Sequence, residues 1–520
     1  MTSNSAGMTE KQTFASVAIV SRSLFRFFMP ALAQVIKDRH GSEVHLYCTT
    51  LEQKREYQRT APAGLFASIN AVDHHWPKTW PENVDEAAVF RRATDFEERY
   101  GLTINSLAVF NRILGRGYAL GGFHYPRSRQ SEGMKYVHMV HAFNEHLGFW
   151  EREVAAKRFT LMLQPGRDEA VVARAFGIPV RNMEPARLFT RYLWAVDEFQ
   201  RCPDIKDAYD RIHDPEGGPI IEKPTLGHLK ARKAALDKAS LRRTFSLIAR
   251  SMAQNVYWRL RGYQKAGVTP LREQIAYRLR QRRDMLQVTS PDLMTLDKLG
   301  DRPFVFFSLH TEPERSLQGL SPEYFFQLSC IASISRDLPA GYLLAVKEHS
   351  ISVGQRPTDF YRQIREFKNV VMLDVREYGL EVVKRSSAIV TITGSIGVEG
   401  ASLGKPVIAF GRHVSYSFLP HVRIVAEDGQ LAGYLREALC QPFDAERAKR
   451  DGKRFLKAVE QASFDMDKRI DSDPLAFDAT IVENCYRTLV ASLRHGAFLE
   501  DPMTKAVPRL ADRRAERVAG

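Results

Sequence analysis

The sequence lacks several features that would point to an exported, membrane-spanning or metal-dependent protein. Its five cysteines stand singly, with no Cys-x-x-Cys pair and no Cys/His group at metal-ligand spacing. We therefore expect reduced thiols and no metal site. No apolar run reaches the roughly 18 residues that a membrane-spanning helix needs, and residues 1–14 lack the apolar stretch of a signal peptide. These absences predict a cytoplasmic protein.

A glycine-rich dinucleotide fingerprint is also missing from the start of the chain. Residues 16–20 read as an apolar strand, 25–38 as an apolar helix and 43–47 as a second strand. This order is Rossmann-like, but no Gly-x-Gly-x-x-Gly motif follows the first strand. No NAD site is implied, and we expect no cofactor.

Acidic residues are scarce in one segment only. The whole chain carries a formal charge of +14, while residues 222–284 hold 16 Lys or Arg and only 4 Asp or Glu. Tyr257, Trp258 and Tyr277 lie among these arginines. The composition suits anionic lipid head groups, and two alternatives are nucleic acid or a helical hairpin that pairs with acidic faces of its own protein. We expect an anionic inner-membrane surface and no nucleic acid, because the segment contains no known nucleic-acid-binding module.

What the chain does contain is a βαβ unit with an anion-binding turn. Residues 388–392 read as a buried strand, a helix begins near Ser395, and residues 404–411 open a second apolar strand. A helix N-terminus at the carboxyl end of a parallel strand favours a phosphate. The candidate nucleotide-sugar residues of this unit are Thr393, Gly394, Ser395, Gly397 and Glu399. Glu399 would accept hydrogen bonds from a ribose diol. The alternative is that the turn only caps a structural helix.

Neighbouring strands end in further polar residues. The strand at residues 303–309 runs into His310, followed by Glu314, and the strand at 342–346 ends in Lys347-Glu348-His349. We expect Lys347 and His349 to share one face of a strand and to bind nucleotide phosphate. His310 and Glu314 are the catalytic candidates; their alternatives are a histidine that caps the strand and a solvated carboxylate before a helix.

Three motifs together, LHTEPE, VKEHS and TITGSIGVEGASLGKPVIAFG, resemble the capsular polysaccharide biosynthesis family of bacterial glycosyltransferases, which includes CMP-Kdo-dependent transferases. More loosely, they resemble the wider GT-B group that contains UDP-N-acetylglucosamine 2-epimerases. The clear resemblance covers residues 300–415. The family usually shows His-Pro where this chain has His349-Ser350, so the rigid turn after the histidine is missing.

The resemblance implies an α/β fold of two Rossmann-like domains facing a cleft, with a basic helical insertion between them and C-terminal bracing helices. The expected divisions follow in chain order: a disordered tail (1–12), an acceptor domain (13–204), the basic helical insertion (205–295), a nucleotide-sugar domain (296–427), a helical return (428–500) and a mobile tail (501–520). In the acceptor domain, His138, His141, His146, Arg127 and Arg129 are candidates for contacts with an acceptor.

The leading functional hypothesis is therefore a glycosyltransferase of surface polysaccharide synthesis. It would take a nucleotide-linked sugar, with CMP as the favoured nucleotide, and transfer the sugar to a glycan or lipid-linked acceptor. We expect it in the cytoplasm, with peripheral attachment to the inner membrane as a variant. One alternative is a sugar-nucleotide 2-epimerase, which needs further acid and base carboxylates. Another is a non-catalytic capsule-assembly protein, favoured by the altered turn after His349.

Overall fold

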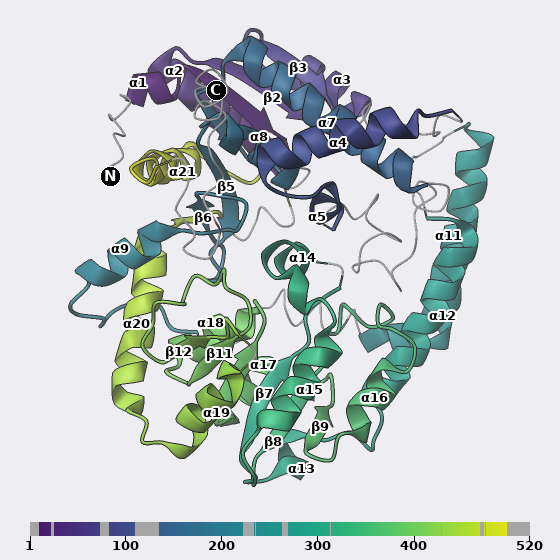
Figure 1. Cartoon of the computed structure of the whole chain (residues 1–520), viewed down its shortest axis with the longest axis vertical. Coiled ribbons are helices and arrows are strands. Elements are labelled where there is room, and N and C mark those ends of the chain that lie inside the picture. The colour runs from purple at the N-terminus through teal and green to yellow at the C-terminus, as the bar shows by residue number, and fades with distance from the viewer. Residues whose placement is uncertain are drawn as a thin grey trace. The chain divides into compact units, whose positions relative to one another are not determined.

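The computed structural model describes residues 10–21, 25–72, 83–109, 135–221, 233, 236–262, 269–312, 314–427, 429–467, 473 and 475–496. The chain divides into two compact units. The first comprises residues 1–107, 134–211 and 458–520, and the second comprises 108–133 and 212–457. Each unit contains one sheet flanked by helices (Figure 1). The predicted α/β class with two Rossmann-like domains is confirmed.

The sheet of the first unit has the order β13-β6-β5-β4-β1-β2-β3. Its strands are β1 (Ser16–Val20), β2 (Glu43–Cys48), β3 (Ser68–Ala71), β4 (Leu161–Leu163), β5 (Val180–Pro185), β6 (Arg191–Ala195) and β13 (Phe464–Asp465). The pairs from β3 to β5 are parallel, whereas β6 and β13 add an antiparallel edge. The predicted opening strand at residues 16–20 is confirmed.

Helices of the first unit cover this sheet. They are α1 (Glu10–Thr13), α2 (Phe28–His40), α3 (Leu51–Thr60), α4 (Glu86–Tyr100), α5 (Ile104–Ala108), α7 (Tyr136–Lys157), α8 (Arg167–Ala175), α9 (Pro203–Arg211) and α21 (Ala479–Ser492). From the C-terminal part of the chain, α21 packs on α2 and joins the same apolar core as β1 and β2. Late-chain helices therefore brace the first unit, as the fold class predicts.

In the second unit six strands form a sheet in which every neighbouring pair is parallel. They are β7 (Phe304–Ser308), β8 (Leu343–Lys347), β9 (Val370–Leu373), β10 (Ala388–Thr391), β11 (Val407–Ala409) and β12 (Val422–Ile424). The order β12-β11-β10-β7-β8-β9 reverses direction between β7 and β10. Open α/β sheets bind ligands at such a reversal, outside the carboxyl ends of the strands.

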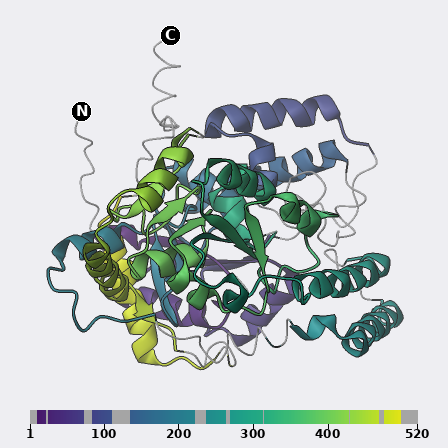
Figure 2. The same cartoon turned by 90° about the horizontal axis from the view of Figure 1, so that it is seen from below.

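The remaining elements of the second unit surround this sheet. They are η4 (Asp237–Ala239), α11 (Leu241–Leu260), α12 (Leu271–Val288), α13 (Leu296–Leu299), α14 (Arg315–Leu320), η5 (Pro322–Tyr324), α15 (Gln327–Asp337), α16 (Phe360–Glu366), α17 (Gly379–Arg385), α18 (Ser395–Ser402), α19 (Gln430–Cys440) and α20 (Ala445–Gln461). Helices α11 and α12 lie side by side (Figure 2). Among the described residues, no helix is both long and apolar enough to cross a membrane.

Candidate nucleotide-sugar site

The carboxyl edge of the second sheet carries most of the predicted site residues. The strand order reverses between β7 and β10, which makes these two strands neighbours. The residues that follow them therefore lie together, although more than 80 positions separate them in the sequence. His310 follows β7, Thr393 and Gly394 follow β10, and Lys347 ends the neighbouring strand β8. The edge is therefore built by topology rather than by a local motif.

The turn between β10 and α18 has the predicted form. Gly394 is the N-cap in an extended conformation, and no side chain caps the helix. The Gly394 N–H donates to Thr391 Oγ1 over 3.0 Å, and Ser395, the first helical residue, is exposed. No acidic residue lies in the first turn of α18. The helix therefore begins with its backbone donors uncovered by a capping side chain, which suits an anion.

Two residues of this turn have structural reasons for their identity that the sequence did not reveal. A Cβ on Gly394 would lie 2.9 Å from Thr391 Oγ1 and 3.1 Å from His310 Nε2. A Cβ on Gly397 would collide with the hydroxyl of the buried Tyr416. Gly397 is itself buried, so it allows close packing within the protein, where we had expected it to admit a phosphate.

Thr393 supports the turn instead of facing a ligand. It is 2% exposed, and its hydroxyl donates to the Ser316 carbonyl over 3.1 Å. Its N–H donates to Nε2 of His310 over 3.0 Å. The hydroxyl that the sequence offered as a phosphate donor is therefore directed toward the backbone of α14.

His310 holds the two strand ends together. Its side chain is buried, and its Nε2 accepts a hydrogen bond from the Thr393 N–H. In the neutral ring the proton therefore lies on Nδ1. The His310 backbone N–H donates to Gln327 Oε1 over 2.6 Å, and its carbonyl accepts from Arg356 Nη2 over 2.7 Å. This geometry favours the strand-capping interpretation of His310, and its catalytic role stays a prediction.

The two glutamates that follow His310 differ in environment. Glu314 is the N-cap residue of α14, is partly exposed and makes no side-chain cap. Glu312 is buried and pairs with Arg356 Nη1 over 2.8 Å. Burial raises the pKa of Glu312 to about 7, against the opposing charge of Arg356. Of the two, Glu314 keeps the access that a catalytic carboxylate requires.

A buried ionic network that we did not predict lies beneath this edge. Arg356, which is 1% exposed, donates to both carboxylate oxygens of Glu348 over 2.7 Å and also pairs with Glu312. Tyr361 donates to Glu348 Oε2 over 2.8 Å, and the backbone N–H of His349 donates to Oε1 over 2.6 Å. The network therefore fixes the chain immediately after β8, where Lys347 and His349 lie.

Contrary to our expectation, Lys347 and His349 do not both lie on a strand. β8 ends at Lys347, so the alternation of a strand does not extend to His349. The bidentate bond between Arg356 and Glu348 instead draws residue 348 inward. The side chain of His349 is partly exposed, and its Nδ1 accepts weakly from the Ile351 N–H over 3.4 Å.

Lys347 and Glu399 form the charged part of the site. Burial raises the pKa of Glu399 to about 7, while the positive charge of Lys347 opposes this shift. The two side chains are partly exposed, and both belong to the carboxyl edge of the sheet, because Lys347 ends β8 and Glu399 lies in α18 after β10. A cation and a titratable carboxyl group are thus present at the edge where α18 begins.

A cavity of about 210 Å³ opens at the same edge. It lies beyond the ends of β11 and β12, where Phe410 and Val425 contribute to its wall together with Tyr324 and Leu431. The rings of Tyr324 and Phe410 are 5.0 Å apart. A second cavity of about 220 Å³ is lined by Pro406 and His421 at the opposite edge, so it is not part of this site.

The first unit has a comparable strand reversal between β1 and β4. After β4, Gln164 is buried with a φ of 61°, and the first turn of α8 holds Asp168 and Glu169. Nε2 of the buried His146 lies 3.5 Å from Glu169 and 3.8 Å from Asp168. Burial lowers the pKa of His146, but the carboxyl groups of Glu169 and Asp168 raise it by a larger amount. The pKa of His146 is therefore higher than the usual value for histidine. Burial raises the pKa of Asp168 to about 7, against the charge of His146.

The other acceptor candidates are divided between buried, partly exposed and undescribed positions. His138 is buried in the first turn of α7, and its Nδ1 accepts from the Lys135 N–H over 3.3 Å. His141 is partly exposed on the same helix. Arg127 and Arg129 lie outside the described residues. The proposed acceptor contacts of these residues stay a prediction.

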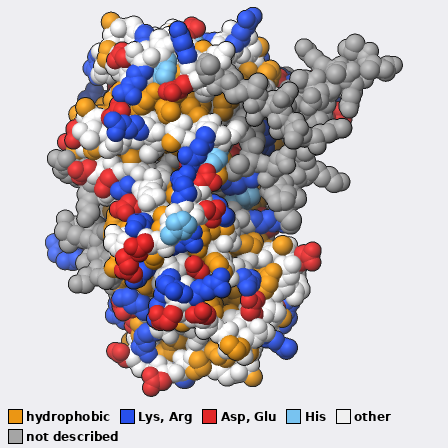
Figure 3. Space-filling model, turned by 90° about the vertical axis from the view of Figure 1, so that its left-hand side faces the viewer, with side chains coloured by type: hydrophobic (Ala, Val, Ile, Leu, Met, Phe, Trp, Pro, Cys, Tyr) orange, Lys and Arg blue, Asp and Glu red, His pale blue; other side chains and the backbone are white. Residues whose placement is uncertain are grey.

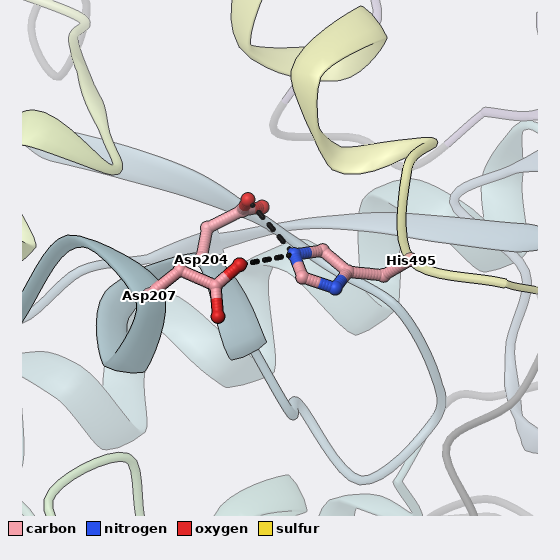
Figure 4. Close-up of side chains that lie close together, drawn as sticks. All are labelled: Asp204, Asp207 and His495. Atoms are coloured by element: carbon pink, nitrogen blue, oxygen red, sulfur yellow. Dashed lines mark hydrogen bonds and ion pairs between the residues drawn. The ribbon is translucent and has the colours of Figure 1, made fainter. Parts of the chain in front are cut away.

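One group of His and carboxylate side chains in the first unit has atoms close enough to hold a metal ion (Figure 4). In it, His495 Nε2 contacts Asp204 over 3.0 Å and Asp207 over 3.4 Å. Arg494 also contacts Asp204 over 2.5 Å and Asp207 over 3.3 Å. Because Arg494 and His495 already contact both carboxylates, the group joins the end of α21 to α9, and we assign it no metal.

The family model that matches this chain covers residues of the second unit. Residues 222–419 match the family model described as "Capsule polysaccharide biosynthesis protein". The family resemblance predicted from the three motifs is thereby confirmed for this segment. A search of curated proteins finds no match.

Solved structures give weak matches over larger parts of the chain. The Thermosulfurimonas dismutans KpsC β-Kdo 2,7 transferase is 12% identical, with 66% of this chain and 88% of that chain covered and a TM-score of 0.31. The β-Kdo 2,4 transferase of the same KpsC is 15% identical, with coverages of 57% and 78% and a TM-score of 0.28. The S. aureus MnaA-UDP structure is 11% identical, with coverages of 95% and 100% and a TM-score of 0.26. These scores are too low to support an argument about function.

Proposed function

We propose, from the match of residues 222–419 to capsule polysaccharide biosynthesis proteins, that this chain is a glycosyltransferase that uses a nucleotide-linked sugar. The observation that carries the proposal is the uncapped N-terminus of α18 at the strand reversal of a fully parallel sheet. A CMP-linked sugar is the first donor to test. The acceptor is a glycan or a lipid-linked glycan. The protein would be cytoplasmic and would reach this acceptor at the anionic surface of the inner membrane.

Each exposed group at this edge has a role in donor binding. The backbone donors of α18 and the hydroxyl of Ser395 hold a phosphate oxygen, and Lys347 balances the phosphate charge. The ionised carboxylate of Glu399 accepts hydrogen bonds from the ribose diol. His310 and Thr393 act indirectly, because their hydrogen bond fixes the turn that carries Gly394.

The chemical step is a substitution at the anomeric carbon of the sugar. The oxygen of an acceptor hydroxyl forms the new glycosidic bond, and the bond between the anomeric carbon and the phosphate oxygen breaks. The departing phosphate keeps the bonding electron pair, which Lys347 and the positive end of α18 stabilise. A carboxylate takes the proton of the acceptor hydroxyl, and Glu314 is our candidate because it is partly exposed beside this edge.

The epimerase alternative is less well supported by the described residues. It needs additional acid and base carboxylates near the sugar. Two carboxylates at this edge, Glu312 and Glu348, are buried and bound to Arg356. They are therefore poorly suited to exchanging protons with a substrate.

A charge reversal at the start of α18 tests the proposal. Ser395→Glu leaves the exposed position compatible with a helix, since a carboxylate is favourable in a first helical turn, but it repels a phosphate. We expect the dissociation constant for CMP or UDP to rise at least tenfold, about 1.4 kcal/mol, when measured by calorimetry. Gln363→Glu is the matched control, because Gln363 is exposed on α16 and the charge change is the same.

The nucleotide that binds also indicates the donor. Binding of CMP would indicate donors of the Kdo or sialic acid type, and binding of UDP would indicate hexosamine chemistry. Equal nucleotide affinity in the wild type and Ser395→Glu would remove α18 from the donor site. The protein could instead bind the nucleotide but release none from a nucleotide-linked sugar when acceptor glycans are present. That result would favour the non-catalytic alternative.

A further inference from the structure

Helix α11 exposes an apolar face that the rest of the described second unit does not cover. Residues separated by 4, 7, 4 and 4 positions lie along one side of this 20-residue helix. They and their exposed fractions are Leu241 (53%), Phe245 (60%), Met252 (48%), Val256 (58%) and Leu260 (81%). We call these five residues the outer stripe. Single exposed apolar residues are ordinary, whereas a contiguous stripe of five indicates an interaction surface.

The other side of α11 explains why the outer stripe is not needed for folding. Thr244 is buried, and Asn255 and Trp258 are partly buried, on a second side of the helix. The neighbour, α12, is anchored in the core of the second unit through Met285 and Val288. The pair therefore consists of an inner helix that is anchored in the core of the second unit and an outer helix that packs beside it (Figure 2).

The charge of α11 is of one sign. The helix contains no Asp or Glu, and it carries four arginines. All four are exposed, and Arg243 also contacts Asp237 over 3.1 Å. By contrast, basic and acidic side chains alternate on the side of the molecule that includes α20 (Figure 3).

Arginines of α12 are less available for a partner. Arg278 donates to Gln281 over 2.9 Å, and Arg283 pairs with Asp284 over 2.9 Å. The sequence did not distinguish the two helices, because arginines are frequent in both. The structure identifies α11 as the helix whose cations and apolar residues are exposed together.

We propose that the outer face of α11 docks on an anionic lipid bilayer. The outer stripe enters the boundary between head groups and acyl chains, while the long arginine side chains reach the phosphates. A second copy of this chain is a poorer occupant, because two α11 helices would bring arginines together without a carboxylate in either helix. A nucleic acid would pair with the arginines but not with five aliphatic or aromatic side chains. The proposal goes beyond the transfer reaction and does not require it.

The test is co-sedimentation of the full chain with vesicles of two compositions at low salt. One contains phosphatidylcholine alone, and the other contains phosphatidylcholine with about a third phosphatidylglycerol. We expect at least tenfold more bound protein on the anionic vesicles. Binding should weaken as salt shortens the Debye length from about 10 Å at 0.1 M to about 3 Å at 1 M.

Two triple variants separate the apolar and the ionic contributions. Phe245→Gln, Met252→Gln and Val256→Gln together remove the centre of the outer stripe, and Arg242→Gln, Arg250→Gln and Arg259→Gln together remove three of the four exposed arginines of α11. Each should reduce binding to anionic vesicles at least tenfold. Leu51→Gln is the control, since Leu51 is also 50% exposed but lies on α3 in the first unit. All three should retain the melting temperature and the nucleotide affinity of the wild type.

Three results would overturn the proposal. The first is wild-type protein that ignores anionic vesicles at low salt. The second is a stripe variant that binds as well as the wild type. The third is a dimer in sedimentation velocity that the stripe variant converts to a monomer, which would make a second copy the occupant. Unchanged nucleotide affinity in all variants would leave the proposed function intact in each case.

Discussion

The two sheets present the same topological feature, but the helices that begin there differ in the charge of their first turns. In each, the strand order reverses next to the first strand, and a helix begins just beyond the reversal: α8 in the first unit and α18 in the second. The first turn of α8 holds Asp168 and Glu169, whereas the first turn of α18 holds no acidic residue. A carboxylate is favourable at the positive end of a helix, as a phosphate is, so Asp168 and Glu169 make the start of α8 less favourable for a phosphate than the start of α18.

This contrast shows that fold alone does not locate the donor site. Both reversals satisfy the rule for ligand sites in open α/β sheets. Only the second combines an exposed Ser395, the cation of Lys347 and the carboxyl group of Glu399. The first instead buries His146 with two carboxyl groups.

The largest effect should come from removing the support beneath the second edge. Arg356→Met leaves Glu348 buried without its bidentate partner, and the loss of one member of a buried ion pair costs about 3–5 kcal/mol. We expect this decrease in the free energy of unfolding from chemical denaturation. Arg362→Met on α16 is the control, because its side chain is 71% exposed, and it should change stability by less than about 0.5 kcal/mol. An Arg356→Met protein of wild-type stability would contradict the buried network.

Substitutions of His310 should give the next largest effect on stability. They also distinguish a structural role of the ring from a catalytic one. His310→Ala removes the acceptor for the Thr393 N–H, and a buried unsatisfied donor costs about 1–3 kcal/mol. His310→Gln supplies a side-chain oxygen as acceptor and should recover most of the stability.

Turnover of the His310→Gln variant then decides the role of the ring. A purely structural His310 predicts that turnover returns together with stability. A loss of at least about 100-fold in rate at restored stability would instead assign general acid or base chemistry to the imidazole.

A smaller effect concerns the pH dependence of donor binding. The pKa of Glu399 is about 7, and only its ionised form accepts both hydrogen bonds from a ribose diol. Affinity for nucleotide should therefore be highest above pH 7 and should fall as the pH decreases from 7 to 6, by up to about tenfold. Calorimetric titrations at several pH values measure this slope. Glu399→Gln should bind with reduced affinity that varies little over the same range, and an unchanged slope would exclude Glu399 as its source.

Much of the second unit could be predicted from the sequence because its signals are local. The buried strand at residues 388–391, the helix start at Ser395 and the break between α11 and α12 all follow from runs of apolar residues, glycine and proline. The charge contrast between α8 and α18 is also visible in the sequence, as Gly166-Arg167-Asp168-Glu169 against Gly394-Ser395-Ile396-Gly397.

The parts that escaped prediction depend on distant residues. Pairing of β13 with β6 joins residues more than 250 positions apart, and no local pattern marks the two-residue strand β13. The engagement of Glu348 by Arg356 also left no local signal, and the end of β8 at Lys347 was not predicted. Gly397 was interpreted from its neighbours in the motif, while its packing partner Tyr416 lies in another loop.

The central claim is that nucleotide binds at the start of α18 and not at the start of α8. Amide hydrogen exchange measured by mass spectrometry, with and without saturating CMP or UDP, tests it directly because both edges are observed in the same experiment. We predict slower exchange at residues 393–399 and 347–349 on addition of nucleotide, with no change at residues 164–169. Protection confined to residues 164–169 would contradict the account and move the donor site to the first unit.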